Sequence, residues 1–189
     1  DYFASRVGRP LDAPARVATL RDKLLELSRC GVDQVIVARF DARLASMPAE
    51  TFVRDVLLGG LNARYVLVGD DFRFGARRTG DYAMLDALGD VHGFDVARMQ
   101  SYEVHDARVS SSAVRDALAS GNMLQAQALL GRPHALSGRV MHGRKLGREL
   151  GFRTMNLKFS AARSAANGIF VAAVHGLSDH ALPAVASIG

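Results

Sequence analysis

The sequence is poor in cysteine and has no long apolar run. The single cysteine, Cys30, excludes an internal disulfide. It lies in "LLELSRCG", where we expect a buried structural thiol rather than a nucleophile, because no local signature of catalysis surrounds it. No apolar run is long enough to cross a bilayer, and "DYFASRVGRP" lacks the apolar core of a signal peptide. We therefore expect a cytoplasmic protein with no membrane partner.

Clustered basic charge and zinc-ligand spacing are also missing. The formal net charge of +5 favours acidic partners such as nucleotides or phosphates. Lys and Arg are scattered, however, whereas nucleic-acid-binding proteins concentrate them on one face. The six histidines are not paired with Cys or Asp at ligand spacing, and no Gly-x-Ser-x-Gly elbow occurs. These patterns favour small-molecule substrates over a nucleic acid, a zinc site or a serine nucleophile, and leave the oligomeric state open.

The first two-thirds of the chain alternate between helical and strand-like patterns. Leu20, Leu24 and Leu27 fall on one helical face that ends at Gly31. Buried strands are expected at 33–40, 63–69 and 94–104. Helices are expected at 18–31, 48–60, 80–90, 109–118 and 123–131. This alternation predicts an α/β fold with a parallel sheet.

After residues 131–133 the pattern changes to short strands separated by Gly, Asn and Ser. Strand candidates lie at 134–143, 154–159, 168–176 and 183–189. They predict a small β-barrel or sandwich, and hence a domain boundary near Arg132, with domains at 1–131 and 132–189. A complete barrel in this second stretch would be marginal, so we expect a barrel that is cut short.

The segment "VSSSAVRDAL", residues 109–118, places serines at an expected helix start and Arg115 in its first turn. A serine there caps backbone N–H groups. A cation is mildly unfavourable at this positive end of the helix dipole unless an anion lies nearby. The segment is therefore either a helix cap alone or also half of a phosphate site.

The loop "DDFRFGARRTGD", residues 70–81, follows an expected strand, where ligands bind in open α/β sheets. Phe72 and Phe74 offer ring faces or edges, Asp71 offers hydrogen-bond acceptors, and Gly75 permits close backbone approach. These residues suit an aromatic, anionic ligand. The alternative is an ordinary turn whose phenylalanines fold back into the core.

A glycine-rich segment, residues 142–156, carries Gly143, Lys145 and Gly147. Such glycines let backbone N–H groups face phosphate oxygens, and Lys145 adds a positive charge. Thr154 and Asn156 would share one face of a strand and offer hard oxygen ligands suited to Mg²⁺. The alternative is a glycine-rich hairpin with a polar outer face.

Three segments, in this order, resemble the bacterial bifunctional riboflavin kinase/FMN adenylyltransferase family, also called FAD synthetase. "VGDDFRFG" resembles its flavin-side loop, and "VSSSAVR" resembles the Ile-Ser-Ser-Thr-x-x-Arg motif of nucleotidyltransferases. "LLGRPHALSGRVMHGRKLGRELGFRTMN" resembles its linker, Gly-rich segment and Pro-Thr-Ala-Asn motif. The resemblance implies a Rossmann-like nucleotidyltransferase sheet followed by a β-barrel kinase. It also implies that ATP phosphorylates riboflavin to FMN and that a second ATP adenylylates FMN to FAD.

The resemblance also implies roles for single residues. Ser110, Ser111 and Arg115 would hold ATP phosphates, as would Gly143, Lys145 and Gly147 in the kinase part; Asp71, Phe72 and Phe74 would border the flavin; and Thr154 and Asn156 would bind Mg²⁺.

The chain departs from the family pattern in several places. The family's His-x-Gly-His motif does not occur, and its kinase glutamate would fall beyond Gly189. Arg153 stands in place of Pro, Met155 in place of Ala and Ser112 in place of Thr. The catalytic residues are therefore not identified, and we expect a chain that lacks both ends of the enzyme. Two other functions stay open, which are adenylyl transfer to a non-flavin acceptor and non-catalytic binding of nucleotides or RNA.

Overall fold

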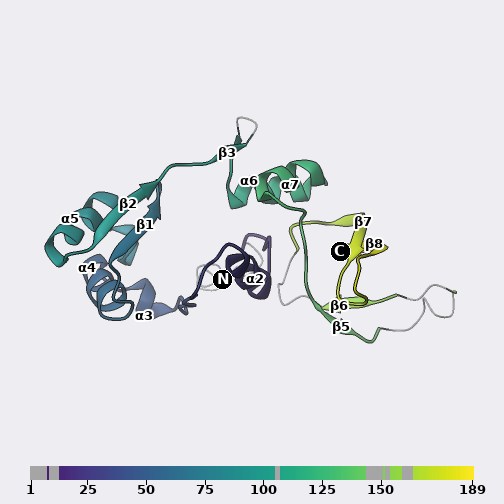
Figure 1. The fold of residues 1–189 in the computed structure, drawn as a ribbon, viewed down its shortest axis with the longest axis horizontal. Helices are drawn as coiled ribbons and strands as arrows, with labels where there is room; N and C mark the ends of the chain where they lie inside the picture. The colour runs from purple at the N-terminus through teal and green to yellow at the C-terminus, as the bar shows by residue number, and fades with distance from the viewer. Residues whose placement is uncertain (1–7, 9–12, 105–106, 144–150, 152–153, 159–163) are drawn as a thin grey trace. The chain divides into compact units, whose positions relative to one another are not determined.

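The computed structural model describes residues 8, 13–104, 107–143, 151, 154–158 and 164–189 (Figure 1). The chain divides into two compact units, which are described separately. The first unit is centred on Ile36–Glu103, and the second combines Val7–Val35 with Val104–Gly189. The architecture mixes helices with four two-stranded sheets among the described residues. None of the described helices has the length and apolar character needed to span a membrane.

The first unit contains a parallel strand pair with helices packed beside it. Its elements are α3 (Ala42–Ala45), α4 (Ala49–Thr51), the π-helix η2 (Phe52–Leu58), β1 (Tyr65–Gly69), the 3-10 helix η3 (Ala76–Arg78), α5 (Tyr82–His92) and β2 (Asp95–Met99). The short strand β3 (Glu103–Val104) follows and pairs with β4 (Ala107–Arg108). The helices expected at 48–60 and 80–90 are therefore present, as are strands within 63–69 and 94–104.

Strands β1 and β2 run parallel, with Tyr65 opposite Asp95 and Gly69 opposite Met99. One apolar core holds this unit together, since a buried apolar face of a sheet needs a partner layer. Its fully or nearly buried members are Ala49, Val53, Val68, Phe74, Leu85 and Phe94. In β1 only every second side chain turns toward this core, so the strand is half-buried rather than buried on both faces.

The prediction of a buried strand at 33–40 is wrong. These residues have no regular secondary structure, and Ile36 and Val37 keep 67% and 59% of their surface exposed. A strand exists only when its backbone N–H and C=O groups pair with a neighbouring strand. No described segment pairs with residues 33–40, so the β-branched composition alone does not produce a strand.

The second unit combines three helices with antiparallel strand pairs. Its elements are α2 (Leu20–Arg29), α6 (Ser111–Ala119), α7 (Met123–Leu130), β5 (Arg139–Met141), β6 (Asn156–Lys158), β7 (Gly168–Val174) and β8 (Leu182–Ile188). Helices α6 and α7 supply most of its buried core, together with Ala165 and Ala166. Asn122 caps α7 by accepting a hydrogen bond from the Gln125 backbone N–H at 3.0 Å, as expected for a helix start.

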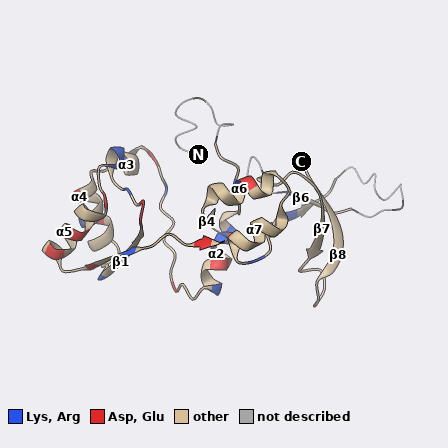
Figure 2. Cartoon of the chain, turned by 90° about the horizontal axis from the view of Figure 1, so that it is seen from above, with Lys and Arg blue, Asp and Glu red and all other residues tan. Residues whose placement is uncertain are grey.

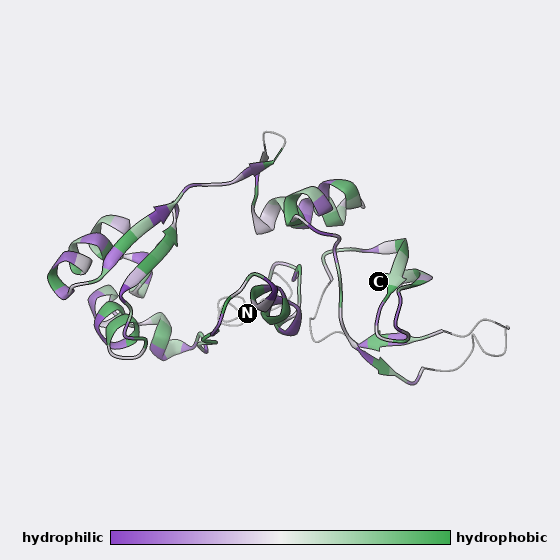
Figure 3. Cartoon of the chain, in the orientation of Figure 1, coloured by the Kyte–Doolittle hydropathy of each residue, from purple (hydrophilic) through white to green (hydrophobic). Residues whose placement is uncertain are grey.

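The β7–β8 hairpin shows the two-residue burial period of a half-buried sheet. Phe170 and Ile188 pack against the core of the unit. The opposite face is apolar but exposed, and Val171 keeps 91% of its surface accessible. Figure 3 shows the hydrophobic colouring of this hairpin.

Helix α2 corrects one expectation. Cys30, the C-cap residue, is an exposed free thiol and not the buried one expected from the sequence. The cause is that no residue of α2 is buried against the described part of the chain, and Leu20 and Leu27 of its apolar face are exposed as well. Contacts of this helix are polar, as described below.

Candidate functional site

The N-terminus of α6 is capped by Ser110. The Ser110 Oγ accepts a hydrogen bond from the Ala113 backbone N–H at 3.1 Å, and the extended backbone of Ser110 is typical of an N-cap. Ser111 is the first helical residue, and its side chain is exposed. Because Ser111 and Arg115 are four residues apart, they lie on the same face of α6, with Arg115 one turn beyond Ser111 and not in the first turn as expected. The helix cap is thus part of the structure, and Ser111 and Arg115 share one face of the helix that it begins.

Arg115 has a structural partner of its own. Its Nε donates a hydrogen bond to the backbone carbonyl of Ala15 at 2.7 Å, and its side chain is half-buried. The partner is a hundred residues away in sequence, so no local pattern could have indicated it. A carbonyl oxygen offsets part of the cost of a cation near the positive end of a helix. Arg115 therefore holds the segment before α2 against α6.

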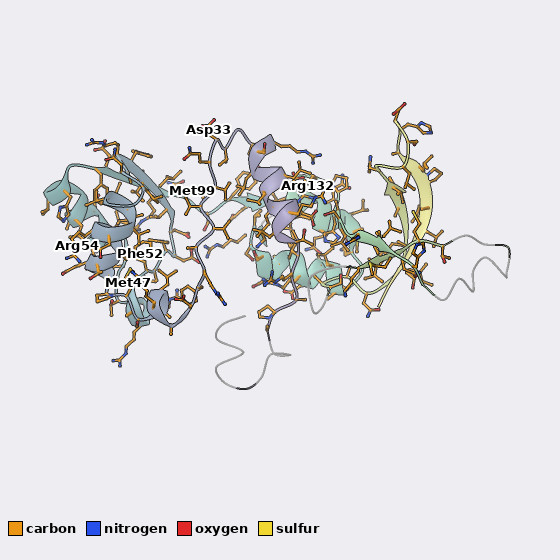
Figure 4. The ribbon with its side chains drawn as sticks, turned by 90° about the horizontal axis from the view of Figure 1, so that it is seen from below. Asp33, Met47, Phe52, Arg54, Met99 and Arg132 are labelled. Atoms are coloured by element: carbon orange, nitrogen blue, oxygen red, sulfur yellow. The ribbon has the colours of Figure 1, made fainter. Side chains whose placement is uncertain are left out.

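The loop between β1 and α5 is built around Phe74, which belongs to the core of the first unit and is 6% exposed. Phe72 stacks on it with ring centroids 5.4 Å apart, and Phe52 contacts it at 5.8 Å. Figure 4 labels Phe52 and Met47; the backbone carbonyl of Met47 accepts a hydrogen bond from Ala76 N–H at 2.7 Å. The alternative of phenylalanines folded into the core thus describes Phe74, whereas Asp71 is exposed.

The glycines of this loop permit close packing. Gly75 has φ +72°, and a Cβ there would lie 2.6 Å from the Cα of Ala49. At Gly80 a Cβ would lie 2.7 Å from the Phe74 ring. Both distances are shorter than any side chain tolerates, so these glycines are explained by the fold.

Two carboxylates mark the ends of this loop. Asp81 caps α5, and the hydrogen bond from Met84 N–H, helped by Arg73, lowers the pKa of Asp81 although desolvation acts against it. Asp70 accepts a hydrogen bond from Ser101 Oγ at 2.5 Å. Asp70 follows β1 and Ser101 follows β2, and parallel strands end at the same edge of a sheet, where ligands bind. Sequence analysis missed Ser101, which fell inside the strand expected at 94–104, whereas β2 ends at Met99.

In the second unit, β5 and β6 bring Gly143 and Asn156 together. Met141 lies opposite Asn156 in the strand register, and a Cβ on Gly143 would overlap the Asn156 side-chain amide. A side chain at 143 would therefore force the Asn156 amide to move. Thr154 is exposed but precedes β6, so the structure does not provide the shared strand face expected for Thr154 and Asn156. Lys145 and Gly147 lie outside the described residues.

The chain was compared with known families and proteins. Residues 4–113 match the family model described as FAD synthetase. Residues 130–189 match the family model described as riboflavin kinase. The riboflavin kinase match begins at residue 130 and contains the sequence change near Arg132, and the compact units of the structure are divided differently.

Relatives in three bacteria carry the description bifunctional riboflavin kinase/FMN adenylyltransferase. The Escherichia coli protein is 46% identical over 177 residues, covering 94% of this chain and 56% of the relative. The proteins of Pseudomonas fluorescens and Haemophilus influenzae are 41% and 39% identical, covering 95% and 100% of this chain but 57% and 60% of the relatives. The chain therefore spans little more than half the length of these relatives.

A similar solved structure is described as a macrolide-efflux protein from Streptococcus pneumoniae. It matches with a TM-score of 0.76 and 27% identity, covering 93% of this chain and 56% of that one. This match over almost the whole chain shows a similar fold. By its match over residues 4–113, the chain belongs to the FAD synthetase family, with a riboflavin kinase segment following at 130–189.

Proposed function

We propose that the full-length protein phosphorylates riboflavin to FMN and adenylylates FMN to FAD. The observation that carries this proposal is the order of the two family matches, FAD synthetase at 4–113 and riboflavin kinase at 130–189. In the first reaction a riboflavin hydroxyl attacks the γ-phosphorus of ATP and ADP leaves. In the second, a phosphate oxygen of FMN attacks the α-phosphorus of another ATP and pyrophosphate leaves. Both transfers depend mainly on positioning and on neutralising the phosphate charge.

For adenylyl transfer, we assign the ATP phosphates to the first turn of α6. A helix N-terminus of this length offers backbone N–H groups to an anion. The exposed hydroxyl of Ser111 lies on the face that also carries Arg115. Ser110 contributes by fixing the helix start, and the guanidinium N–H groups of Arg115 other than Nε complete the set. This division of roles reconciles the cap with the phosphate site.

For the flavin, we assign the loop that carries Asp71, Phe72 and Phe74. The exposed carboxylate of Asp71 offers acceptors for the N–H of the flavin ring. Phe72 is half-buried and offers the outer part of its ring, while Phe74 supports it from the core. On this assignment Phe74 is a positioning residue.

For the kinase reaction, we assign Gly143, Lys145 and Gly147 to the phosphates of ATP, and Thr154 and Asn156 to Mg²⁺. The described part of this set fits a magnesium ion, because a hydroxyl and an amide oxygen are hard ligands and both side chains are exposed. When bound, Mg²⁺ neutralises phosphate charge during transfer. Gly143 leaves the Asn156 amide the room it needs at this site.

The described strands form only two-stranded sheets, whereas the fold proposed for the family contains larger ones. We propose that the parallel pair β1–β2 belongs to a Rossmann-like nucleotidyltransferase sheet, and that β5 to β8 belong to a kinase β-barrel. The parallel register of β1–β2 and the antiparallel registers of β5–β6 and β7–β8 support this assignment. The domains would then be residues 1–131 and 132–189.

The proposal is tested by incubating the full-length protein with riboflavin, ATP and Mg²⁺ and separating the flavins by chromatography. We expect FMN to appear first and FAD to follow. A parallel reaction starts from FMN and ATP, and a third contains a chelator in excess over Mg²⁺. Formation of neither FMN nor FAD in the complete reaction would overturn the proposal.

A further inference from the structure

An open cavity of about 220 Å³ lies in the second unit, and none of the residues assigned above lines it. Its walls come from segments far apart in sequence, namely the first turn of α2 and the strand pair β5–β6. The polar side chains that line it include Thr19 and Ser137, and the basic ones are Arg21, Arg139 and Lys158. Among the described residues that line the cavity none is acidic, although the Asp22 carboxylate accepts hydrogen bonds from Thr19 and Ser137 of its wall. Figure 2 shows basic residues in blue on α2 and near β6.

The three basic side chains occupy positions that are unfavourable without an anion. Arg139 and Lys158 are direct cross-strand partners in the β5–β6 register, and like charges directly opposite one another destabilise a sheet. Arg21 lies in the first turn of α2, near the positive end of the helix dipole. Within the described ranges, none of the three forms an ion pair with an acidic group. One anion in the cavity would relieve all three positions.

The walls of the cavity are fixed to each other by hydrogen bonds around Asp22. Its carboxylate accepts hydrogen bonds from Thr19 Oγ1 at 2.6 Å, from Thr19 N–H at 3.2 Å and from Ser137 Oγ. Partial burial acts to raise the pKa of Asp22, but these hydrogen bonds outweigh it, so the carboxylate stays ionised. Its oxygens are therefore engaged in joining α2 to the segment before β5.

Ionic and polar contacts extend this junction. Arg132 Nε lies 3.0 Å from Glu26 Oε2, and Figure 4 shows Arg132 beside α2. The His134 ring Nε2 is within 3.0 Å of the Val17 carbonyl oxygen. The cavity is thus held open by a framework that does not use Arg21, Arg139 or Lys158.

We propose that this cavity binds a small phosphate-class anion, held by Arg21, Arg139 and Lys158. Its volume is below the roughly 300–1,000 Å³ of sites that enclose drug-sized ligands, which favours inorganic phosphate or pyrophosphate over a whole nucleotide. Because α2 lies in the FAD synthetase match and β5–β6 in the riboflavin kinase match, the anion would bind both parts of the chain at once. The site does not depend on the proposed activities.

Lys158 and Asn156 are two residues apart on β6 and therefore share a face of the strand. The test must distinguish a separate anion site from an extension of the proposed kinase site. Arg21 distinguishes the two, because it lies on α2 and not on the strands of the proposed kinase site. Lys23 is the matched control, since it is an exposed cation on the same helix and does not line the cavity.

Binding is measured by calorimetry on the full-length protein, with phosphate, pyrophosphate and AMP as separate titrants and KCl at matched ionic strength as a blank. We expect saturable binding of phosphate or pyrophosphate. Arg21→Gln and Lys158→Gln should each weaken it about tenfold, as for loss of one charged hydrogen bond. Lys23→Gln and Asn156→Ala should leave it unchanged. The tighter of the two inorganic titrants identifies the source of the anion.

Thermal unfolding gives a second measurement, because the difference in melting temperature between Lys158→Gln and the wild type should change sign when phosphate is added. Without phosphate, Lys158→Gln should leave the melting temperature unchanged or raise it, because it removes a repulsion across the strands. With saturating phosphate, the variant should melt below the wild type. Absence of saturable binding would overturn the proposal. So would a loss in Asn156→Ala equal to that in Lys158→Gln, or AMP binding more than about tenfold tighter than both inorganic anions.

Discussion

The first turn of α6 and the strand pair β5–β6 are both assigned to phosphates of ATP, but they use their polar groups differently. At α6, Ser110 caps the helix and Arg115 holds the Ala15 carbonyl, so both side chains already serve the fold. At β5–β6, Asn156 is exposed in a strand of three residues, with Gly143 beside it. Substitutions of Ser110 and Arg115 should therefore change stability and activity together, whereas those at β5–β6 should change activity alone.

The largest effect is expected for Asn156→Ala. Loss of residues that merely support a metal ligand costs about 10- to 100-fold, so loss of a ligand should slow FMN formation by about 100-fold or more. The free energy of unfolding should change by no more than about 0.5 kcal/mol, as for substitutions at other exposed positions. Initial rates from riboflavin and ATP, with thermal melting, measure both. Leu157→Ala on the other face of the strand is the control, and a marked fall in melting temperature for Asn156→Ala would break the comparison.

Arg115→Ala should lower both stability and FAD formation. The lost hydrogen bond from a charged group to Ala15 should cost about 1.5 kcal/mol of unfolding free energy. Arg115→Lys keeps the charge but not the guanidinium geometry, so it should recover part of the ATP affinity and little of the stability. Urea unfolding and ATP titration separate the two. If stability is unchanged in Arg115→Ala, the contrast with Asn156 does not hold.

Gly143→Ala should reduce FMN formation by displacing the Asn156 amide, by about tenfold. Because both substitutions act through the same amide, adding Gly143→Ala to Asn156→Ala should cost little more. A double-mutant cycle on initial rates measures this coupling. Additive losses would mean that Gly143 acts independently of Asn156.

A smaller effect separates Ser110 from Ser111. Ser110→Ala removes the cap and should destabilise the protein by about 1 kcal/mol, whereas Ser111→Ala should be nearly neutral. Both should weaken ATP binding for FAD formation if both lie at the phosphates. Chemical unfolding and ATP affinity of the pair provide the comparison. Equal destabilisation by the two alanines would contradict the capping geometry.

The smallest effect concerns the cap of α2, where Asp22 and Thr19 form a capping box. Hydrogen bonds lower the pKa of Asp22 below its usual value of 3.8 despite partial burial. Its contribution is therefore complete above about pH 4 and is lost as pH falls through the lowered pKa. Asp22→Asn should remove about 0.5 kcal/mol of stability at pH 6 and less at pH 3. Urea unfolding across this range tests it, and an equal loss at both pH values would contradict the assignment.

The sequence predicted features that depend on near neighbours. Ser110 and Asn122 cap helices because a side chain and a backbone N–H three residues on are sufficient to form the cap. Strands β1 and β2 were also located from their β-branched and aromatic residues, although the sequence predicted them to be buried and neither is buried throughout. The failures involve distant partners: residues 33–40 have no neighbouring strand, and Cys30 belongs to a helix whose apolar face is not covered by described residues.

In the candidate sites, too, the sequence predicted what depends on near neighbours and missed what depends on distant partners. Phe72 and Phe74 were identified as a pair, but only packing against Phe52 and Ala49 shows that Phe74 belongs to the core. The partner of Arg115 and the closeness of Gly143 to Asn156 depend on contacts across the fold. Ser101 was missed because a single serine inside an expected strand carries no pattern, although its hydroxyl reaches Asp70.

The central claim is that two reactions occur at two separate places. It is tested most directly by supplying FMN to the Asn156→Ala variant of the full-length protein together with ATP and Mg²⁺. The account predicts that FAD forms at the wild-type rate from supplied FMN, while almost none forms from riboflavin. Failure of supplied FMN to restore FAD formation, in a variant that melts like the wild type, would contradict it.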